Sequence, residues 1–312
     1  MGDLVKGKVA VVTGAGAGIG RTEALGLADH GAKVIVNDLG TTVDGMGSSH
    51  GPADEVVAEI RGNGGEAVAS YASVATVEGA ESIIRLAFET YGGLDILINN
   101  AGITKDRMIY NVSDEEWISI LQINLFGTFY TTRAACRIMR KQKYGRIINT
   151  SSHAGLGNMG QAAYSAAKEG IVGLSRTVGR DMARYGVTCN VIRPVSGTRG
   201  FRDMLQKGGL RQAWTSMWGV EKAEERIHQM LELNKPEDIA SLVIYLASEK
   251  ADNINSCIFE VWHGHIGIYK EPVPATEILW KNGRWTPEEL AETIPQTLTR
   301  ENVRELPPFF PF

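Results

Sequence analysis

The chain has 312 residues, 43% of them hydrophobic and 22% charged, which is enough to bury a full core in one large domain or two. Its net charge of -4 argues against a nucleic-acid partner, which would require a basic stripe, and no apolar run approaches the ~18 residues that a membrane span needs. Three separated cysteines, an N-terminus without a signal-peptide core and a C-terminus without a peroxisomal address predict a cytoplasmic protein with reduced thiols.

The first predicted element is a buried strand at residues 8–13, an apolar and β-branched run that ends in glycines. Glycine recurs at Gly14, Gly18 and Gly20, and a helix over residues 21–30 follows. A strand, a glycine-rich turn and a helix N-terminus form a cradle for a pyrophosphate, because backbone N–H groups point at the anion and no Cβ blocks its approach. A tight turn that binds no ligand is the alternative interpretation.

The second strand, at residues 33–38, ends at Asp38. A carboxylate at this place can accept hydrogen bonds from both hydroxyls of an adenosine ribose, and it would repel a 2′-phosphate. Arg21 could attract that phosphate, but strand geometry places Asp38 better, so the sequence favours NAD over NADP. A helix cap is the other interpretation of Asp38.

The alternation of helices and strands then continues through a polar, glycine-rich loop, a helix, a strand, a helix and a fourth strand, at residues 40–51, 52–63, 66–71, 78–91 and 94–98. Ser73 and Val74 lie just past the third strand, where the edge of an adenine would rest. The fourth strand leads into two asparagines, Asn99 and Asn100, whose amides could lock neighbouring strands or contact a cofactor.

Residues 114–140 predict one long helix, with Ser113 as its N-cap. Asn124 lies among apolar residues in the middle of this helix, and an amide there costs free energy unless it is hydrogen-bonded. Gly127 weakens the helix at the same place. This polar interruption could therefore hold a water molecule.

Ser151 and Ser152 end the fifth predicted strand, residues 145–152, and Tyr164 and Lys168 lie four apart on one face of the next helix. The reference pKa of a phenol is about 10, and a nearby ammonium favours the phenolate and lowers that pKa. With a serine hydroxyl to hold the substrate oxygen, these groups could interconvert an alcohol and a ketone. Taken alone, tyrosine and lysine at this spacing usually form a solvated helix face.

Strands at residues 187–194 and 256–262 complete the pattern. We therefore predict an α/β fold, a doubly wound, seven-stranded parallel sheet of Rossmann type with helices on both faces. Ligands should gather at the carboxyl ends of the strands. An NAD-binding domain over residues 1–268 and a C-terminal extension over residues 269–312 are expected.

Taken together, these motifs resemble the short-chain dehydrogenase/reductase family over about residues 8–264. They are Thr13-Gly14-x-x-x-Gly18-Ile19-Gly20, Asn99-Asn100-Ala101-Gly102, Asn124 in Asn-Leu-Phe-Gly, the serine pair, Tyr164-x-x-x-Lys168 and Asn190-Val191-Ile192-Arg193-Pro194. One branch is more similar, the (3R)-hydroxyacyl-CoA dehydrogenase units of peroxisomal multifunctional enzymes of type 2 and their single-domain bacterial relatives. That branch resembles the chain in the segments at 36–40, 141–148, 160–164 and 259–267.

The resemblance implies an NAD-dependent oxidoreductase acting on the CH–OH group of lipid or steroid substrates. It implies that Tyr164 exchanges the proton, that Lys168 binds the nicotinamide ribose and tunes the phenol, and that Asn124 holds a relay water. The implied contacts with NAD are Gly14, Gly18, Ile19, Gly20, Asp38, Ser73, Val74, Asn100, Tyr164 and Lys168, with Ser196, Gly197, Thr198 and Arg199 near the nicotinamide carboxamide.

Two positions depart from the family pattern. Ser151 lies thirteen residues before Tyr164, the usual spacing, whereas Ser152 lies twelve before it. The strand register through residues 147–150 nevertheless favours Ser152, with one residue missing from the following loop, so Ser152 is the predicted catalytic serine. Ala72 stands where many relatives carry an adenine-binding aspartate.

Residues 198–235 are rich in methionine and tryptophan, which is typical either of an apolar lid over a lipid-like substrate or of a helix pair buried against the core. Four basic residues there could meet the phosphates of CoA or form a solvated face: Arg199, Arg202, Lys207 and Arg211. His263 and His265 lack an obvious third ligand, so no metal site is predicted. Trp280 and Trp285 make the C-terminal extension apolar enough to pack on the core or on a neighbouring subunit, and the resemblance implies a homodimer or homotetramer.

The leading hypothesis is an NAD-dependent dehydrogenase that converts a 3-hydroxyacyl-CoA, with a straight or steroid-derived acyl group, into the 3-oxoacyl-CoA. The alternative is a dehydrogenase of hydroxysteroids or other free secondary alcohols. A non-catalytic NAD-binding scaffold is a hypothesis from another class. It is disfavoured because asparagine, serine, tyrosine and lysine are all present.

Overall fold

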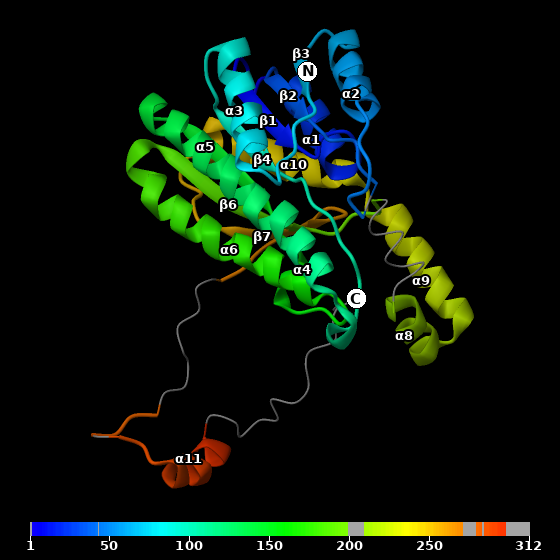
Figure 1. Cartoon of the computed structure of the whole chain (residues 1–312), viewed down its shortest axis with the longest axis vertical. Coiled ribbons are helices and arrows are strands. Elements are labelled where there is room, and N and C mark those ends of the chain that lie inside the picture. The colour runs from blue at the N-terminus through cyan, green and yellow to red at the C-terminus, as the bar shows by residue number, and fades with distance from the viewer. Residues whose placement is uncertain (1, 43, 199–208, 271–278, 283, 298–312) are drawn as a thin grey trace. The chain divides into compact units, whose positions relative to one another are not determined.

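The apolar runs of the sequence form the strands of one sheet in the computed structural model (Figure 1). The structure describes every residue except 1, 43, 199–208, 271–278, 283 and 298–312. Within that part of the chain the strand order is β3-β2-β1-β4-β5-β6-β7-β8. The strands are β1 Val9–Thr13, β2 Lys33–Asn37, β3 Glu66–Ser70, β4 Ile96–Asn99, β5 Gly145–Thr150, β6 Val187–Pro194, β7 Ile258–Trp262 and β8 His265–Ile268.

Strands β1 to β7 pair in parallel, which confirms the predicted doubly wound sheet. The predicted number of strands is one too few, because β8 pairs antiparallel with β7 and places Ile266 opposite Val261. The chain turns between them at His263 and Gly264, which both have positive φ, 29° and 73°, as two-residue hairpin turns require. β8 has only four residues, which is too short for its alternation of apolar and polar side chains to identify a strand.

Helices cover both faces of the sheet (Figure 1). The helices that bear on the core are α1 Gly18–Asp29, α2 Gly51–Gly62, α3 Val77–Tyr91, α4 Asp114–Leu121, α5 Gly127–Gln142, α6 Ala162–Met182 and α10 Pro236–Ala247. Alternate residues of β1 point to opposite faces, so that Ala10 and Val12 pack with α1, α2 and α10, whereas Val9 and Val11 pack with α3 and α5. Both faces are therefore buried, as a parallel sheet requires.

The predicted long helix is present but contains a turn of a different kind. A π-helical turn, Gln122–Phe126, separates α4 from α5, and Asn124 lies within it, fully buried. Such turns widen the helix by one residue and occur often at functional sites. Ser113 caps α4 in a capping box with Glu116, as predicted from the sequence.

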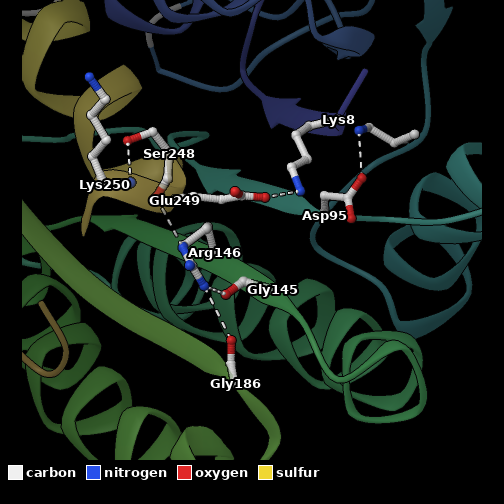
Figure 2. A network of polar contacts seen from close by, with 9 residues as sticks. Lys8, Asp95, Gly145, Arg146, Gly186, Ser248, Glu249 and Lys250 are labelled. Carbon is white, nitrogen blue, oxygen red and sulfur yellow. Dashed lines mark hydrogen bonds and ion pairs between the residues drawn. The ribbon is translucent and has the colours of Figure 1, made fainter. Parts of the chain in front are cut away.

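The amino ends of the strands are tied together by a polar network (Figure 2). The Arg146 side chain is 3% exposed and donates from Nε to the carbonyl of Ser248 and from Nη1 to the carbonyls of Gly145 and Gly186. Lys8 Nζ pairs with Glu249 at 2.8 Å nearby. This network lies at the edge of the sheet opposite the carboxyl ends of the strands, so it bears on stability.

Two further helices follow β6, in the region where a lid or a buried helix pair was considered. Helices α8 Gly209–Trp218 and α9 Val220–Leu233 contact each other, with the Arg226 guanidinium 5.0 Å from the Trp218 ring centroid. Met217 and Val220 are exposed, and Ala223 and Ile227 are buried. Arg202 and Lys207 lie outside the described residues, so the lid stays a prediction.

The chain forms two compact units, Met1–Tyr269 and Lys270–Phe312. In the second unit, Thr286 and Glu289 form a capping box for α11 Pro287–Thr293. Lys281 Nζ lies 4.9 Å from the ring centroid of Trp285, and Trp280 is 81% exposed. Across the described ranges, no helix is long and apolar enough to cross a membrane.

Candidate active site

The glycine-rich turn between β1 and α1 has the backbone that the sequence predicts. Gly14 has φ +65°, and a Cβ on it would lie 2.8 Å from the Cα of Ala101, so this position requires glycine. The Asn100 side chain donates to the carbonyls of Thr13 and Gly14 at 3.1 and 3.0 Å. The end of β4 thus holds the turn at the N-terminus of α1, where Gly18 begins the helix and Ile19 packs on the core.

Asp38 follows β2 and lies against this turn. Its Oδ2 accepts from the N–H of Gly16, and its Oδ1 accepts from the N–H of Gly40, both at 2.7 Å. The carboxylate therefore does not cap a helix, which was the other interpretation of this residue. Arg21, the group considered for a 2′-phosphate, forms an ion pair with Glu59.

The remaining predicted cofactor residues occupy loops after β3 and β6. Ser73 Oγ accepts from the N–H of Ala75 at 3.2 Å, and Val74 is buried among the residues that α3 and α5 cover. Ser196 is buried, and the Gly197 N–H donates to the carbonyl of Asn234 at 2.7 Å.

Thr198 is placed directly against the glycine turn. Its Cγ2 lies 3.2 Å from the point that a Cβ on Gly18 would occupy, so the loop after β6 meets the start of α1. Gly20, one turn into that helix, is buried. Arg199 lies outside the described residues.

The two serines at the end of β5 have different partners. Ser151 is buried, and its Oγ donates to the backbone carbonyl of Lys168 at 2.8 Å. Ser152 Oγ accepts from the N–H of Ala154 at 3.2 Å and hydrogen-bonds with the phenol of Tyr164. Ser152 is therefore the serine that faces the candidate acid/base group.

Tyr164 and Lys168 lie on α6, and both belong to the same site. Lys168 is 3% exposed, its Nζ donates to the carbonyl of Thr150 at 2.8 Å, and it lies 5.4 Å from the Tyr164 ring centroid. Burial lowers the pKa of Lys168 to about 8, because the charged amine loses its water. The lysine thus joins the end of β5 to the helix.

The structure does not show the acidified phenol that the sequence led us to expect. Burial raises the pKa of Tyr164 to about 12, the hydrogen bond with Ser152 lowers it, and the charge of Asp106 raises it further. Lys168 donates one of its three ammonium hydrogens to the carbonyl of Thr150. Tyr164 is placed to exchange a proton with an alcohol or ketone oxygen.

Asn124 completes the group from the π-helical turn. Its Nδ2 donates to the carbonyls of Ile103 and Ile120, both at 2.9 Å, while its buried Oδ1 has no hydrogen-bond partner among the described residues. A Cβ on Gly102 would lie 2.5 Å from Oδ1 and 3.5 Å from Lys168 Nζ. Glycine at this place therefore leaves a polar gap between the amide and the amine, which fits the predicted water.

The sequence did not single out two polar residues that support this site. Gln161 Nε2 donates to Asp106 Oδ1 at 2.8 Å, and the N–H of Arg107 donates to the carbonyl of Gly160 at 2.7 Å. The loop after β4 is thereby fixed to the loop that leads into α6. The available signal for Asp106 was a charged residue in the loop that follows β4.

The arrangement fits a nicotinamide dinucleotide. The turn presents helix N-terminal N–H groups without a Cβ, a carboxylate stands at the end of β2, and an unpartnered acceptor lies beside the Lys168 amine. A phenol and a serine hydroxyl meet next to this cradle. The site can bind a dinucleotide and exchange a proton with an alcohol or ketone oxygen.

Comparison with known proteins gives three findings. Residues 8–200 match the sequence model of a family described as short chain dehydrogenase. The chain is 41% identical over 288 residues to peroxisomal multifunctional enzyme type 2 of Mus musculus, covering 92% of this chain and 36% of that protein, so it spans about a third of the mouse enzyme. It is 38% identical over 299 residues to hydroxyacyl-CoA dehydrogenase ChsB1 of Mycobacterium tuberculosis, covering 93% and 88%.

The fold has a solved counterpart as well. It is similar to the crystal structure of a short chain dehydrogenase from Mycobacterium avium, with a TM-score of 0.79, 40% sequence identity and coverage of 98% of each chain.

Proposed function

Because this chain belongs to the short-chain dehydrogenase family, we propose that it is an NAD-dependent 3-hydroxyacyl-CoA dehydrogenase. The comparisons confirm the resemblance inferred from the motifs, and the chain is an oxidoreductase that acts on CH–OH groups. The finer proposal rests on the meeting of Ser152, Tyr164 and Lys168 beside the glycine turn and Asp38. The name of one relative, hydroxyacyl-CoA dehydrogenase ChsB1, supports the thioester substrate.

Each residue of the site has a separate task in this proposal. A bound nicotinamide would supply the hydride chemistry at the carbinol carbon. Ser152 donates a hydrogen bond that holds the substrate oxygen, and Tyr164 exchanges the proton with that oxygen at its Oη. Lys168 holds the ribose, and Asn124 orients the water in the gap beside it.

The cofactor choice is proposed from charge. The Asp38 carboxylate stands at the end of β2, where a ribose lies in dinucleotide-binding folds, and it would repel a 2′-phosphate. Arg21 is engaged by Glu59 and offers no free cation to that phosphate. Both features support NAD over NADP.

Apolar side chains beside the site support a large lipid-like substrate. Two segments joined through Arg107 and Gly160 carry large exposed hydrophobic residues. These are Met108, Ile109, Tyr110, Leu156 and Met159, which are 40%, 64%, 76%, 57% and 81% exposed. A substrate with a long or fused-ring acyl group would cover such a surface, and burial of that area would contribute to binding.

The test is a substrate panel followed through NADH or NADPH formation. It contains straight-chain and steroid-derived 3-hydroxyacyl-CoA esters together with free hydroxysteroids. We expect turnover of thioesters with NAD. Turnover of a free alcohol with no turnover of any thioester would reject the proposed substrate and favour the hydroxysteroid alternative.

Three variants test the residues, and the two serine variants form a matched pair. Tyr164→Phe should abolish turnover while NAD still binds, and retained activity would refute the proton route. Ser152→Ala should lower kcat by about a hundredfold, since it removes a donor to the reacting oxygen. Ser151→Ala, which removes only a bond to the Lys168 carbonyl, should cost less than about tenfold. A larger loss of kcat in Ser151→Ala than in Ser152→Ala would identify Ser151 as the catalytic serine.

A further inference from the structure

A second polar cluster adjoins the catalytic serine through the next residue of the chain. His153 follows Ser152 and begins the short helix η3 His153–Leu156, which Ser152 caps. The Nδ1 of His153 lies 3.3 Å from the hydroxyl of Tyr269, and its ring meets the Trp262 ring edge-on at 5.6 Å. The segment that carries the serine is thus linked to the edge of the sheet, beyond β8.

Tyr269 is itself held by a buried cation. The Arg193 guanidinium lies 4.6 Å from the centroid of the Tyr269 ring, and the Arg193 side chain is fully buried on β6. Its Nη2 donates to Glu169 Oε2 at 2.7 Å. The Tyr269 backbone N–H donates to the carbonyl of Ile258, which fixes the tyrosine to β7.

Glu169 brings the cluster back to the same short helix. It follows Lys168 on α6, and its Oε2 would lie 2.8 Å from a Cβ on Gly155, within η3. The segment after Ser152 is therefore contacted twice, by Tyr269 at His153 and by Glu169 at Gly155. Neither contact involves Tyr164.

The charges around Arg193 are balanced by two carboxylates. Glu169 pairs with it directly, and Glu260 is its partner in the register of β6 and β7. Glu260 Oε1 in turn lies 2.9 Å from His265 Nε2 on β8. Burying an unpaired guanidinium costs free energy of folding. The cluster therefore depends on α6, β6, β7 and β8 all being in place.

We propose that His153 and Tyr269 are positioning residues for Ser152. On this proposal, which rests on the proposed function, the hydroxyl–imidazole contact holds η3 so that the serine oxygen stays in line with Tyr164. A catalytic donor must be held within about 0.5 Å of its productive position. A contact made by the next residue of the chain restrains that position directly. The ion pair of Arg193 and Glu169 supports η3 at Gly155.

The experiment compares variants of the contact with a matched control. Tyr269→Phe keeps the ring over Arg193 but removes the hydroxyl, which also hydrogen-bonds with Arg193 and Glu260. His153→Leu removes the partner nitrogen and leaves those other bonds in place. Each should lower kcat about tenfold, with the KM for NAD and the thermal midpoint of unfolding unchanged. His153→Asn, which keeps a polar atom near the Nδ1 position, should recover most of the rate. Tyr144→Phe removes a tyrosine hydroxyl at the other end of the sheet and should leave kcat within about twofold.

A double-mutant cycle then asks whether the effect passes through the serine. In the Ser152→Ala background, Tyr269→Phe should cause no further loss, because there is no hydroxyl left to position. Equal losses with and without Ser152, or an unchanged kcat in both Tyr269→Phe and His153→Leu, would overturn the proposal. Any substrate that the enzyme turns over serves for this cycle. Failure of the thioester proposal, or activity retained in Tyr164→Phe, is therefore distinguishable from failure of the positioning role.

Discussion

The Nζ of Lys168 donates to the backbone carbonyl of Thr150 at 2.8 Å, so the amine of the candidate site is anchored to the last residue of β5. The bond places the positive charge of Lys168 at the end of β5, two residues before Ser152. The pKa of the neighbouring Tyr164 phenol is raised by burial rather than lowered.

Lys168→Met should make the protein inactive but more stable at pH 7. Burial lowers the pKa of Lys168 from its ordinary value to about 8, so stability is full above the unfolded pKa of about 10.5 and is lost as the pH falls through 8. At pH 7 the protein carries the whole cost of the buried charge, which is on the order of 1–3 kcal/mol. Urea unfolding measures the gain, which should shrink as the pH rises from 8 to about 10.5. A variant less stable than the parent at pH 7 would show that the bond to Thr150 outweighs burial.

Glu23→Leu should raise stability, and more so in alkaline solution. Glu23 on α1 is fully buried, and neither carboxylate oxygen has a hydrogen-bond partner in the described part of the chain. Burial raises its pKa from 4.5 to about 8, so stability is full below pH 4.5 and is lost as the pH rises through 8. The gain should be several kcal/mol, on an order-of-magnitude basis, at pH 9 and small at pH 4.

The control for that measurement is Glu55→Leu, at an exposed position of α2. Its effect on the free energy of unfolding should be small, because the side chain is exposed. A Glu23→Leu gain that is the same at pH 4 and pH 9 would contradict the buried, protonated carboxyl.

The sequence predicted those parts of the molecule in which one local pattern decides the structure. The β-branched run before Gly14 and the carboxylate at Asp38 identify a strand end and a dinucleotide turn without tertiary information. The turn at Asn124 was predicted as a polar interruption, but its π-helical form was not. Asn124 donates to the carbonyl of Ile103, and Leu125 packs on the cluster that contains Ala163 and Ala167 of α6. These contacts come from elements distant in the chain.

The electrostatics of the site could not be predicted from spacing. Tyr164 and Lys168 lie one helical turn apart, which suggests a lowered phenol pKa, but the sign of the shift depends on how much water each group loses on burial. The positions of Ser151 and Ser152 also depend on the sheet, because adjacent residues of a strand point to opposite faces. Burial of Glu23 depends on how α1 is turned against the sheet.

The ratio of kcat/KM for NAD to that for NADP should fall by about ten- to a hundredfold in Asp38→Ala, because the repulsion of a 2′-phosphate is removed. Adding Glu59→Ala should lower the ratio further, since it releases Arg21 from its ion pair beside the same turn. Steady-state kinetics with both cofactors measures the change. Glu59→Ala alone should alter the ratio little, and a parent enzyme that uses both cofactors equally would contradict the role given to Asp38.

Arg146→Met should destabilise the fold by about 2–4 kcal/mol without lowering kcat. Its guanidinium is buried and satisfied by three backbone carbonyls, so its loss leaves those acceptors without a donor at the amino ends of β5 and β6 (Figure 2). The matched control is Lys8→Met, which breaks the neighbouring ion pair with an exposed Glu249 and should cost less than about 1 kcal/mol. Urea unfolding with kinetics on the same samples separates the two effects. Loss of activity in Arg146→Met at temperatures where the variant is fully folded would contradict this prediction. It would mean that the network acts on the active site at the opposite end of the sheet, although its contacts lie at the amino ends of the strands.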